Sequence, residues 1–301
     1  MQKTILSTAD VARLFNITET TVKRWADEGT LKCQKTLGGH RKFDIKCVVE
    51  FATANGMEPV GTLVLEQDCF SSAIQIAVLG RDFSALSNIF VEKAMSVDRH
   101  DLYEFLSYLY QHGFSLWEIY DLVLRPGLCE IGDRWKSKEV DIYREHRASH
   151  ETLDAMAKLQ AEIFRKTSVG KQAVCACLDD ELHDIGLRCA ANILEAEGWS
   201  VHFLGSRIPY QSIVEAVKDV RPEIVCLSVT YAEVTSRDIE KLKELRRLVH
   251  RAGGKLVFGG QKMPDKCLDS GCCDGVFHSM KDLAEFVHGL MSSSVVEKHR
   301  K

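Results

Sequence analysis

Residues 173–198 read AVCACLDDELHDIGLRCAANILEAEG, an apolar run followed by a polar loop and an amphipathic segment. The apolar run has the length of a buried strand, and the segment after the loop repeats apolar residues at helical spacing. The same alternation continues with apolar runs at 200–205, 223–230, 255–260 and 274–279 and amphipathic segments at 210–220, 236–254 and 280–291. Repeated units of this kind need right-handed crossovers and a parallel sheet. Residues 171–292 are therefore predicted to form a doubly wound α/β domain.

Ligands of such flavodoxin-like (Rossmann-like) domains bind at the carboxyl ends of the strands. A dinucleotide site is excluded because the loop after the first predicted strand lacks G-x-G-x-x-G. A phosphate-accepting receiver domain is disfavoured as well. Asp179 and Asp180 follow the first strand, but the third strand ends at Ser228, where an aspartate would be expected.

The loop after the first strand instead places a histidine, His183, two residues after Glu181. An imidazole that binds a metal through one nitrogen commonly donates its other N–H to a carboxylate, and Glu181 is placed for that role. Gly186 has no Cβ and would let a bulky group pass between strand and helix. The other strand ends carry small or hydroxyl residues that would line the same channel: Ser228, Thr230, Gly259 and Gly260.

Composition sets the broad class of the protein. The 301 residues are 45% hydrophobic, which favours a globular chain of two or three domains. The eleven cysteines show no C-x2-C spacing and no signal peptide precedes them, so we expect reduced thiols in the cytoplasm. A zinc site from Cys267, Cys272 and Cys273 is a less favoured alternative to small buried side chains. No apolar run approaches the roughly 18 residues of a membrane span, so no membrane partner is expected.

The first 51 residues are basic although the whole chain carries a net charge of −4. They hold nine Lys or Arg against six Asp or Glu. Helical patterns at 7–15 and 19–29 flank a three-residue turn, and two extended segments follow around Gly38-Gly39. Two short helices with a tight turn and a hairpin predict a winged helix-turn-helix domain over residues 1–52, in which the second helix enters a major groove.

The stretch TADVARLFNITETTVKRWADEGTL with GGHRKF resembles the DNA-binding domain of MerR-type and excisionase-like regulators. The resemblance implies an operator of double-stranded DNA. Because one such module binds weakly, specific binding would need a dimer or a higher oligomer. The implied DNA contacts are Thr20, Thr21, Lys23 and Arg24 on the second helix and His40, Arg41 and Lys42 on the wing.

Between the two predicted domains, residues 53–69 read as a linker, and residues 70–166 hold four amphipathic patterns. These patterns, at 71–95, 101–113, 115–138 and 140–164, predict a four-helix bundle. Glu145, His146 and His150 form an E-H-x3-H run on the last of them. A metal held by the two histidines stays open as a less favoured interpretation, because it needs a third ligand from elsewhere.

The spacing of the channel residues matches the signature of cobalamin-binding domains. Glu181-x-His183-x-x-Gly186 is followed after 41 residues by Ser228-Val229-Thr230 and after 28 more by Gly259-Gly260. The resemblance implies that His183 binds cobalt from below, while the nucleotide tail passes Gly186 into the domain. Glu181 departs from this signature, which has Asp at that position.

Trp135, Glu145 and His146 have the W-x9-E-H spacing of the bundle in CarH/LitR-class regulators, where these residues surround the adenosyl group. The chain as a whole resembles that class, which implies a non-enzymatic, adenosylcobalamin-dependent, light-sensitive repressor that assembles into tetramers. One residue departs from the class: Lys136 stands where its photoreceptors carry a histidine after the tryptophan. The alternatives are a sensor of cobalamin supply without photochemistry, a corrinoid methyl carrier and a cofactor-free regulator.

Overall fold

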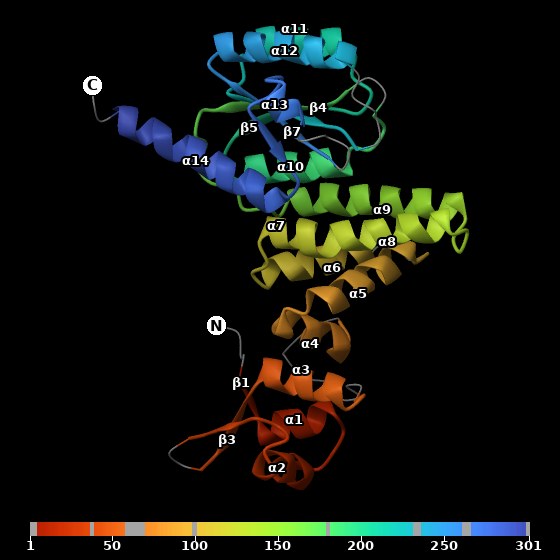
Figure 1. Cartoon of the computed structure of the whole chain (residues 1–301). Coiled ribbons are helices and arrows are strands. Elements are labelled where there is room, and N and C mark those ends of the chain that lie inside the picture. Colours follow the sequence, from red (N-terminus) through yellow and green to blue (C-terminus); the bar gives the residue numbers. More distant parts are fainter. Residues whose placement is uncertain are drawn as a thin grey trace. The chain divides into compact units, whose positions relative to one another are not determined.

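The structure is a computed structural model, and it describes residues 5–36, 39–57, 70–97, 101–178, 181–230, 236–260 and 266–298 (Figure 1). The chain divides into two compact units, Met1–Glu92 and Lys93–Lys301. Several positions from the sequence predictions lie outside the described residues. They are Gly38 of the hairpin turn, most of the predicted linker, and Asp179 and Asp180.

The first unit begins with two short helices. Helix α1 (Thr8–Leu14) starts at Ser7, whose side chain forms a reciprocal capping box with Asp10, and α2 (Glu19–Asp27) starts at Thr18, which accepts from the Thr21 N–H. Strands β1 (Ile5–Ser7), β2 (Gln34–Lys35) and β3 (Arg41–Asp44) form an antiparallel sheet in the order β1-β3-β2. Strand β1 has no counterpart in the sequence prediction, which begins with the first helix.

Helix α3 (Ile45–Ala54) follows β3 directly, and α4 (Ser72–Gly80) packs on the same core. Ile76 and Leu79 of α4 lie against the apolar cluster that also contains Val11, Val22 and Phe43. The predicted helix over 71–95 is in fact two helices, because Arg81 has a left-handed backbone (φ 52°) and separates α4 from α5 (Phe83–Met95).

The second unit contains a helical segment and a sheet domain. Its helices are α6 (Asp101–Gln111), α7 (Leu116–Glu118), α8 (Arg125–Lys136) and α9 (Ile142–Gln160), and α6 and α8 both pack along α9. A π-helical segment, η1 (Ile119–Leu124), joins α7 to α8 without a break. The predicted helix over 115–138 therefore exists, but its middle turn is wider than an α-helical turn.

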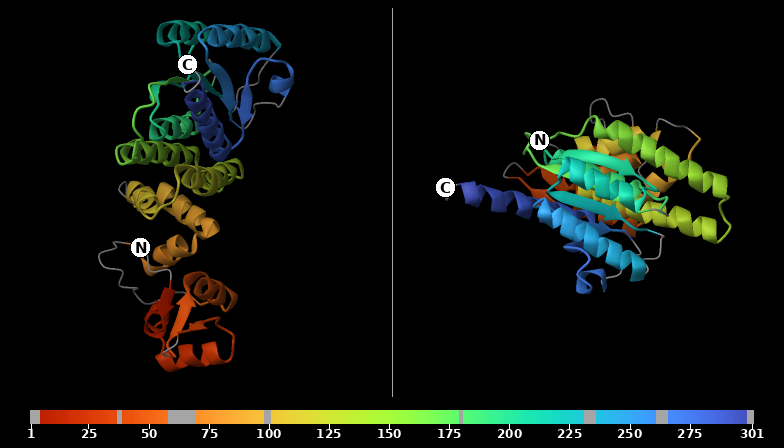
Figure 2. Two further views of the ribbon diagram at one scale, coloured as in Figure 1. Left: turned by 90° about the vertical axis from the view of Figure 1, so that its left-hand side faces the viewer. Right: turned by 90° about the horizontal axis from the view of Figure 1, so that it is seen from above.

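The sheet domain confirms the predicted parallel α/β fold. Five parallel strands run in the order β5-β4-β6-β7-β8, namely β4 (Gln172–Cys177), β5 (Ser200–Gly205), β6 (Ile224–Ser228), β7 (Lys255–Gly259) and β8 (Gly275–Phe277). Helices α11 (Tyr210–Val220) and α12 (Ser236–Arg251) cover one face, and α10 (Ile185–Ala196) and α14 (Met280–Lys298) cover the other (Figures 1 and 2). A short helix, α13 (Lys266–Asp269), precedes β8.

Both faces of the sheet are apolar, which explains why its strands read as continuous apolar runs. Val174 and Ala176 of β4 pack under α11 and α12, whereas Ala173, Cys175 and Cys177 face α10 and α14. The cysteines whose side chains the structure describes form no disulfide.

The zinc alternative gains no support from the described residues, among which no three His, Cys, Asp or Glu side chains form a metal cluster. Cys272 and Cys273 are buried in the apolar core under α11 and α12, while the side chain of Cys267 lies outside the description. In the described part of the chain, no helix combines the length and the apolar character needed to cross a bilayer.

Candidate functional site

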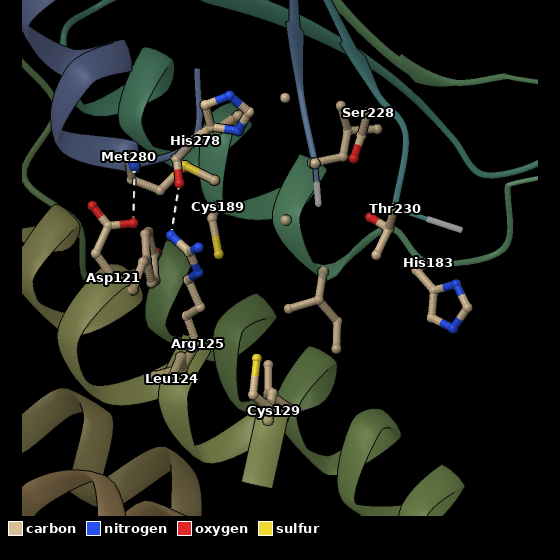
Figure 3. Close-up of a pocket in the computed structure, with 18 of the residues that line it drawn as sticks. Asp121, Leu124, Arg125, Cys129, His183, Cys189, Ser228, Thr230, His278 and Met280 are labelled. Carbon is tan, nitrogen blue, oxygen red and sulfur yellow. Dashed lines mark hydrogen bonds between the residues drawn. The ribbon is translucent and has the colours of Figure 1, made fainter. Parts of the chain in front are cut away.

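The second unit contains a cavity of about 710 Å³. One wall is the carboxyl end of the sheet with α10 and the start of α14, and the other comes from η1, α8 and α9 (Figure 3). Nine of the ten cofactor-binding residues expected from the sequence line it: Trp135, Glu145, His146, His183, Gly186, Ser228, Thr230, Gly259 and Gly260.

The tenth residue, Glu181, lies directly behind His183. Its Oε1 is 2.8 Å from Nδ1 of His183 and also accepts the backbone N–H of His183 at 2.9 Å. The carboxylate therefore favours the tautomer with the proton on Nδ1 and the lone pair on Nε2, the form in which Nε2 can bind a metal. The His183 side chain is 55% exposed and lines the cavity.

Glu181 also connects two loops at the end of the sheet. Its second oxygen, Oε2, accepts the backbone N–H of Thr230 at 2.6 Å, and the side chain is 0% exposed. One buried carboxylate thus joins the β4–α10 loop, which holds His183, to the residues that follow β6. A buried charge of this kind is tolerated because several donors satisfy it.

A thiol lies below the same loop. Cys177 Sγ donates to the carbonyl oxygen of His183 at 3.6 Å. Burial raises the pKa of the Cys177 thiol to about 12, and the nearby carboxylates of Asp184 and Glu181 add to the effect. Cys177 is therefore a neutral thiol near pH 7, a hydrogen-bond donor that supports the loop.

The three predicted glycines differ in what surrounds them. A Cβ on Gly186, in the first turn of α10, would meet no atom within 4 Å and would project into open space. A Cβ on Gly259 would make an ordinary contact with Phe277 O at 3.5 Å. Gly260 has φ 112°, and a Cβ there would lie 2.0 Å from Val229 O. The backbone requires a glycine at 260, whereas the empty space beside Gly186 is available to a ligand.

The opposite wall carries the residues expected from the bundle. Trp135 is partly exposed at the end of α8, and Glu145 on α9 accepts from Ser149 Oγ at 3.0 Å and lies 2.9 Å from Nδ1 of His146. Lys136 also lines the cavity, and its Nζ is 2.9 Å from Asp133 Oδ1. His150, four residues after His146, is not among the lining residues.

Some of the lining residues were not expected from the sequence. Asp121 of η1 accepts the N–H groups of Met280 and Lys281 at 2.9 and 3.0 Å, so it caps the start of α14. One turn later, Arg125 Nη1 donates to the carbonyl of His278 at 2.6 Å (Figure 3). These bonds hold the helical segment against the β8–α14 connection. An acid and a base four residues apart normally indicate a solvent-exposed pair within one helix, so the sequence gives no sign of this contact.

A buried hydrogen bond supports the same junction. Asn192 Nδ2 of α10 donates to the hydroxyl oxygen of Tyr120 at 2.9 Å, and both side chains are buried. Burial raises the pKa of Tyr120 far above its ordinary value. Both Tyr120 and Asp121 belong to the π-helical segment, so the wider turn supplies two successive anchors to the sheet domain.

Several basic residues of the first unit line a second concave region, of about 410 Å³. Its lining includes Lys23 of α2 and the hairpin residues His40, Arg41 and Lys42, together with the acidic Glu19. Thr20, Lys23 and Arg24 are exposed on α2, and Thr21 is partly buried with its hydroxyl 3.0 Å from that of Thr18. Arg41 differs from its neighbours because Nη2 is 2.6 and 2.8 Å from the two carboxylate oxygens of Asp27.

Comparison with known families matches three segments of the chain. A helix-turn-helix domain family matches residues 5–56, and two B12 binding domain families match residues 89–160 and 171–287. The HTH-type transcriptional repressor CarH of Myxococcus xanthus is 34% identical over 135 residues. The similarity covers 44% of each chain, so the match spans less than half of that relative's length.

The chain is also similar to corrinoid proteins. Monomethylamine corrinoid protein 1 of Methanosarcina acetivorans is 26% identical over 186 residues, which cover 60% of this chain and 85% of the relative. The solved monomethylamine corrinoid protein of Methanosarcina barkeri superposes with a TM-score of 0.55 at 18% identity over 69% of the chain and 99% of its own length. At that identity the structural likeness supports the fold alone.

Proposed function

We propose that the chain is an adenosylcobalamin-binding transcriptional regulator, a light-sensitive repressor whose oligomeric state and DNA binding depend on the upper ligand of the cofactor. One observation carries the proposal. In a chain with a helix-turn-helix segment, His183 faces a cavity whose far wall holds Trp135, Glu145 and His146. The partners would be operator DNA and further copies of the chain, in the cytoplasm.

The residues of the cavity fit a corrinoid. His183 presents Nε2 because Glu181 engages Nδ1, which suits an imidazole ligand to cobalt. The open space at Gly186 and the lining residues Ser228, Gly259 and Gly260 suit the passage of the nucleotide tail between the sheet and α10. When bound, adenosylcobalamin supplies a cobalt–carbon bond that light can break.

The helical wall supports a regulatory role. Trp135 and His146 lie on α8 and α9, whereas His183 belongs to the sheet domain, so one ligand in the cavity would contact both parts of the second unit. A ligand that contacts two parts favours the arrangement in which both contacts are made. We propose that the helices of the second unit that line the cavity form a cap of this kind and that the β2–β3 hairpin serves as the wing of the DNA-binding domain.

A second function, a sensor of cobalamin supply without photochemistry, is favoured by Lys136. Its amine lies 2.9 Å from a carboxylate oxygen of Asp133, and a protonated, paired amine is a poor ligand for cobalt. The chain therefore has no replacement ligand at the position after Trp135. A corrinoid methyl carrier is disfavoured, because such a carrier has no use for the helix-turn-helix segment.

The test compares absorption spectra, size-exclusion profiles and DNA binding of the purified full chain with adenosylcobalamin, in the dark and after illumination. We expect a coloured complex whose oligomer and DNA affinity change with light. His183→Ala should lose the colour, and His150→Ala, an exposed histidine outside the cavity, should keep it. A colourless wild-type protein would overturn cobalamin binding. A coloured protein whose oligomer and DNA affinity do not change with light would overturn the light-sensitive repressor and favour the sensor of cobalamin supply.

A further inference from the structure

The hairpin of the first unit is tied to α2 through one carboxylate. Asp27 is the last residue of α2, and its oxygens accept from Nη2 of Arg41 on β3 at 2.6 and 2.8 Å. Lys35 on β2 places its Nζ 3.6 Å from Oδ1 of the same carboxylate. A single side chain at the end of α2 therefore engages both strands of the hairpin.

The position of Asp27 is unusual for an acid. The carboxyl end of a helix carries partial negative charge, so an aspartate in the last turn is unfavourable unless a cation compensates for it. Arg41 supplies that cation, and its hydrogen bond holds the pKa of the Asp27 carboxyl below its ordinary value. Asp27 at this helix end is therefore stabilised by its contact with the hairpin and not by the helix.

Arg41 also lies on the inner side of its strand. Side chains alternate between the two faces of a strand, and Phe43, two residues later, is fully buried in the core of the first unit. The Arg41 side chain is accordingly only 19% exposed, whereas His40 is exposed. Among the described residues of the hairpin, two residue pairs join β2 and β3, and so short a ribbon is weakly ordered by its own bonds.

The orientation of the hairpin determines the shape of the basic groove. Lys23 lies on the α2 side of the groove, and His40 and Lys42 lie on the hairpin side. Glu19, 3.4 Å from Lys23 Nζ, leaves that side with reduced positive charge, so the hairpin residues matter for binding an anion. Two walls that carry cations suit a DNA phosphate only while the distance between them is constrained.

We propose that Arg41 is a positioning residue and not a DNA contact: its bond to Asp27 holds the hairpin on α2, so that Lys23, His40 and Lys42 bind the phosphate backbone together. This proposal rests on the proposed DNA-binding function and replaces the direct contact that the resemblance implied for Arg41.

The test measures binding of the full chain to a short random-sequence DNA duplex by fluorescence anisotropy. Asp27→Asn and Glu28→Gln each remove one negative charge from the end of α2, but only Asp27 holds Arg41. We expect Glu28→Gln to bind DNA slightly more tightly and Asp27→Asn to bind several-fold more weakly. Arg41→Lys, which keeps the charge but loses the paired geometry, should weaken binding to the same extent.

The double variant Asp27→Asn/Arg41→Lys separates positioning from contact. If the two residues act as one clamp, it should bind no more weakly than either single variant. If Arg41 touches DNA, Asp27→Asn should instead tighten binding as Glu28→Gln does, which would overturn the proposal. Should Asp27→Asn fail to fold, as judged by circular dichroism, amide exchange of the hairpin in Arg41→Lys decides whether the clamp exists, because weaker DNA binding by Arg41→Lys would also follow from a direct contact.

A measurement without DNA tests the Asp27–Arg41 clamp independently of the proposed DNA binding. Amide hydrogen exchange of residues 34–44 should accelerate in Asp27→Asn and Arg41→Lys but not in Glu28→Gln. Absence of DNA binding by the wild-type chain would overturn the proposed function alone. Unchanged exchange in both clamp variants would overturn the clamp, whatever the DNA result.

Discussion

The two units of the chain use the same device, a carboxylate that accepts from a basic side chain, in opposite surroundings. Glu181 is 0% exposed and accepts from His183 and from the backbone of Thr230, whereas Asp27 is 53% exposed and accepts from Arg41. A buried carboxylate that loses its partners leaves unpaired groups in the interior, whereas an exposed one is solvated by water. Glu181 should therefore matter for stability and binding, and Asp27 mainly for orientation.

Removal of the buried carboxylate should have the largest effect. Glu181→Ala leaves the Thr230 N–H without this acceptor, which costs about 1–3 kcal/mol of unfolding free energy. It also releases the His183 ring, and loss of such a partner typically lowers metal affinity about 10- to 100-fold. Chemical denaturation and cobalamin titration would measure the two effects. An unchanged cobalamin affinity would show that Glu181 does not orient the ligand.

Gly186→Ala tests whether the empty space beside this residue holds part of the ligand. Because the new methyl group meets no protein atom, the change should stabilise the free protein by up to about 1 kcal/mol through helix propensity. The same methyl group should weaken cobalamin binding by occupying the space beside His183. Thermal unfolding without cofactor and titration with cofactor should thus move in opposite directions. Weaker binding together with lower stability would instead indicate a damaged helix.

Asp274 is a second buried carboxylate of the second unit and should behave like Glu181 in stability. It is 7% exposed and accepts from Arg246, His250 and the backbone of Leu256. Burial raises the pKa of this carboxyl, but the hydrogen bonds outweigh burial, so its pKa lies below the ordinary 3.8. A depressed pKa gives stability that is present above pH 3.8 and is lost as the pH falls below it.

Asp274→Asn should therefore lower the unfolding free energy by about 1 kcal/mol near pH 6, because a charge-assisted bond is lost. The difference from wild type should shrink as the pH falls below 3.8. Denaturation curves at several pH values would measure it. A difference that is constant with pH would mean that the charge contributes nothing.

Asp27 should give the smallest stability effect. Hydrogen bonding to Arg41 lowers the pKa of Asp27, so its contribution is also present above pH 3.8 and lost below it. Because the pair is exposed, salt should screen it. Exchange of the hairpin amides should accelerate in high salt, while the unfolding of the second unit should not change. If amide exchange of the hairpin does not change with salt, the proposed difference between the exposed Asp27 and the buried Glu181 is wrong.

Much of the candidate site was predictable because it follows strand ends. Ser228 and Gly259 end apolar runs and His183 lies in the loop that follows another, and in a parallel sheet these ends meet at one edge. The register of the sheet confirms that these strand ends are adjacent, since Cys177 pairs with Ser228 and Ser228 pairs with Gly259.

The residues that were missed come from contacts between elements. Asp121 and Arg125 reach the β8–α14 connection because η1 packs there, and no periodicity in their own helix predicts the partner. Strand β1 was missed because three residues that pair with β3 give no pattern of their own. Asp27 could have been noticed in the sequence, because an acid is unfavourable at the carboxyl end of a helix. The sequence does not show, however, that its partner is Arg41 of the hairpin.

The amino-acid sequence by itself determined the parallel sheet, the helix pair at the start of the chain and the histidine at the edge of the sheet, because local periodicity and the order of elements are sufficient for these. Only the tertiary structure decided that Glu181 joins two loops and that Arg41 turns toward Asp27. Both depend on distances between side chains and backbone groups on separate elements, which spacing along the chain does not define.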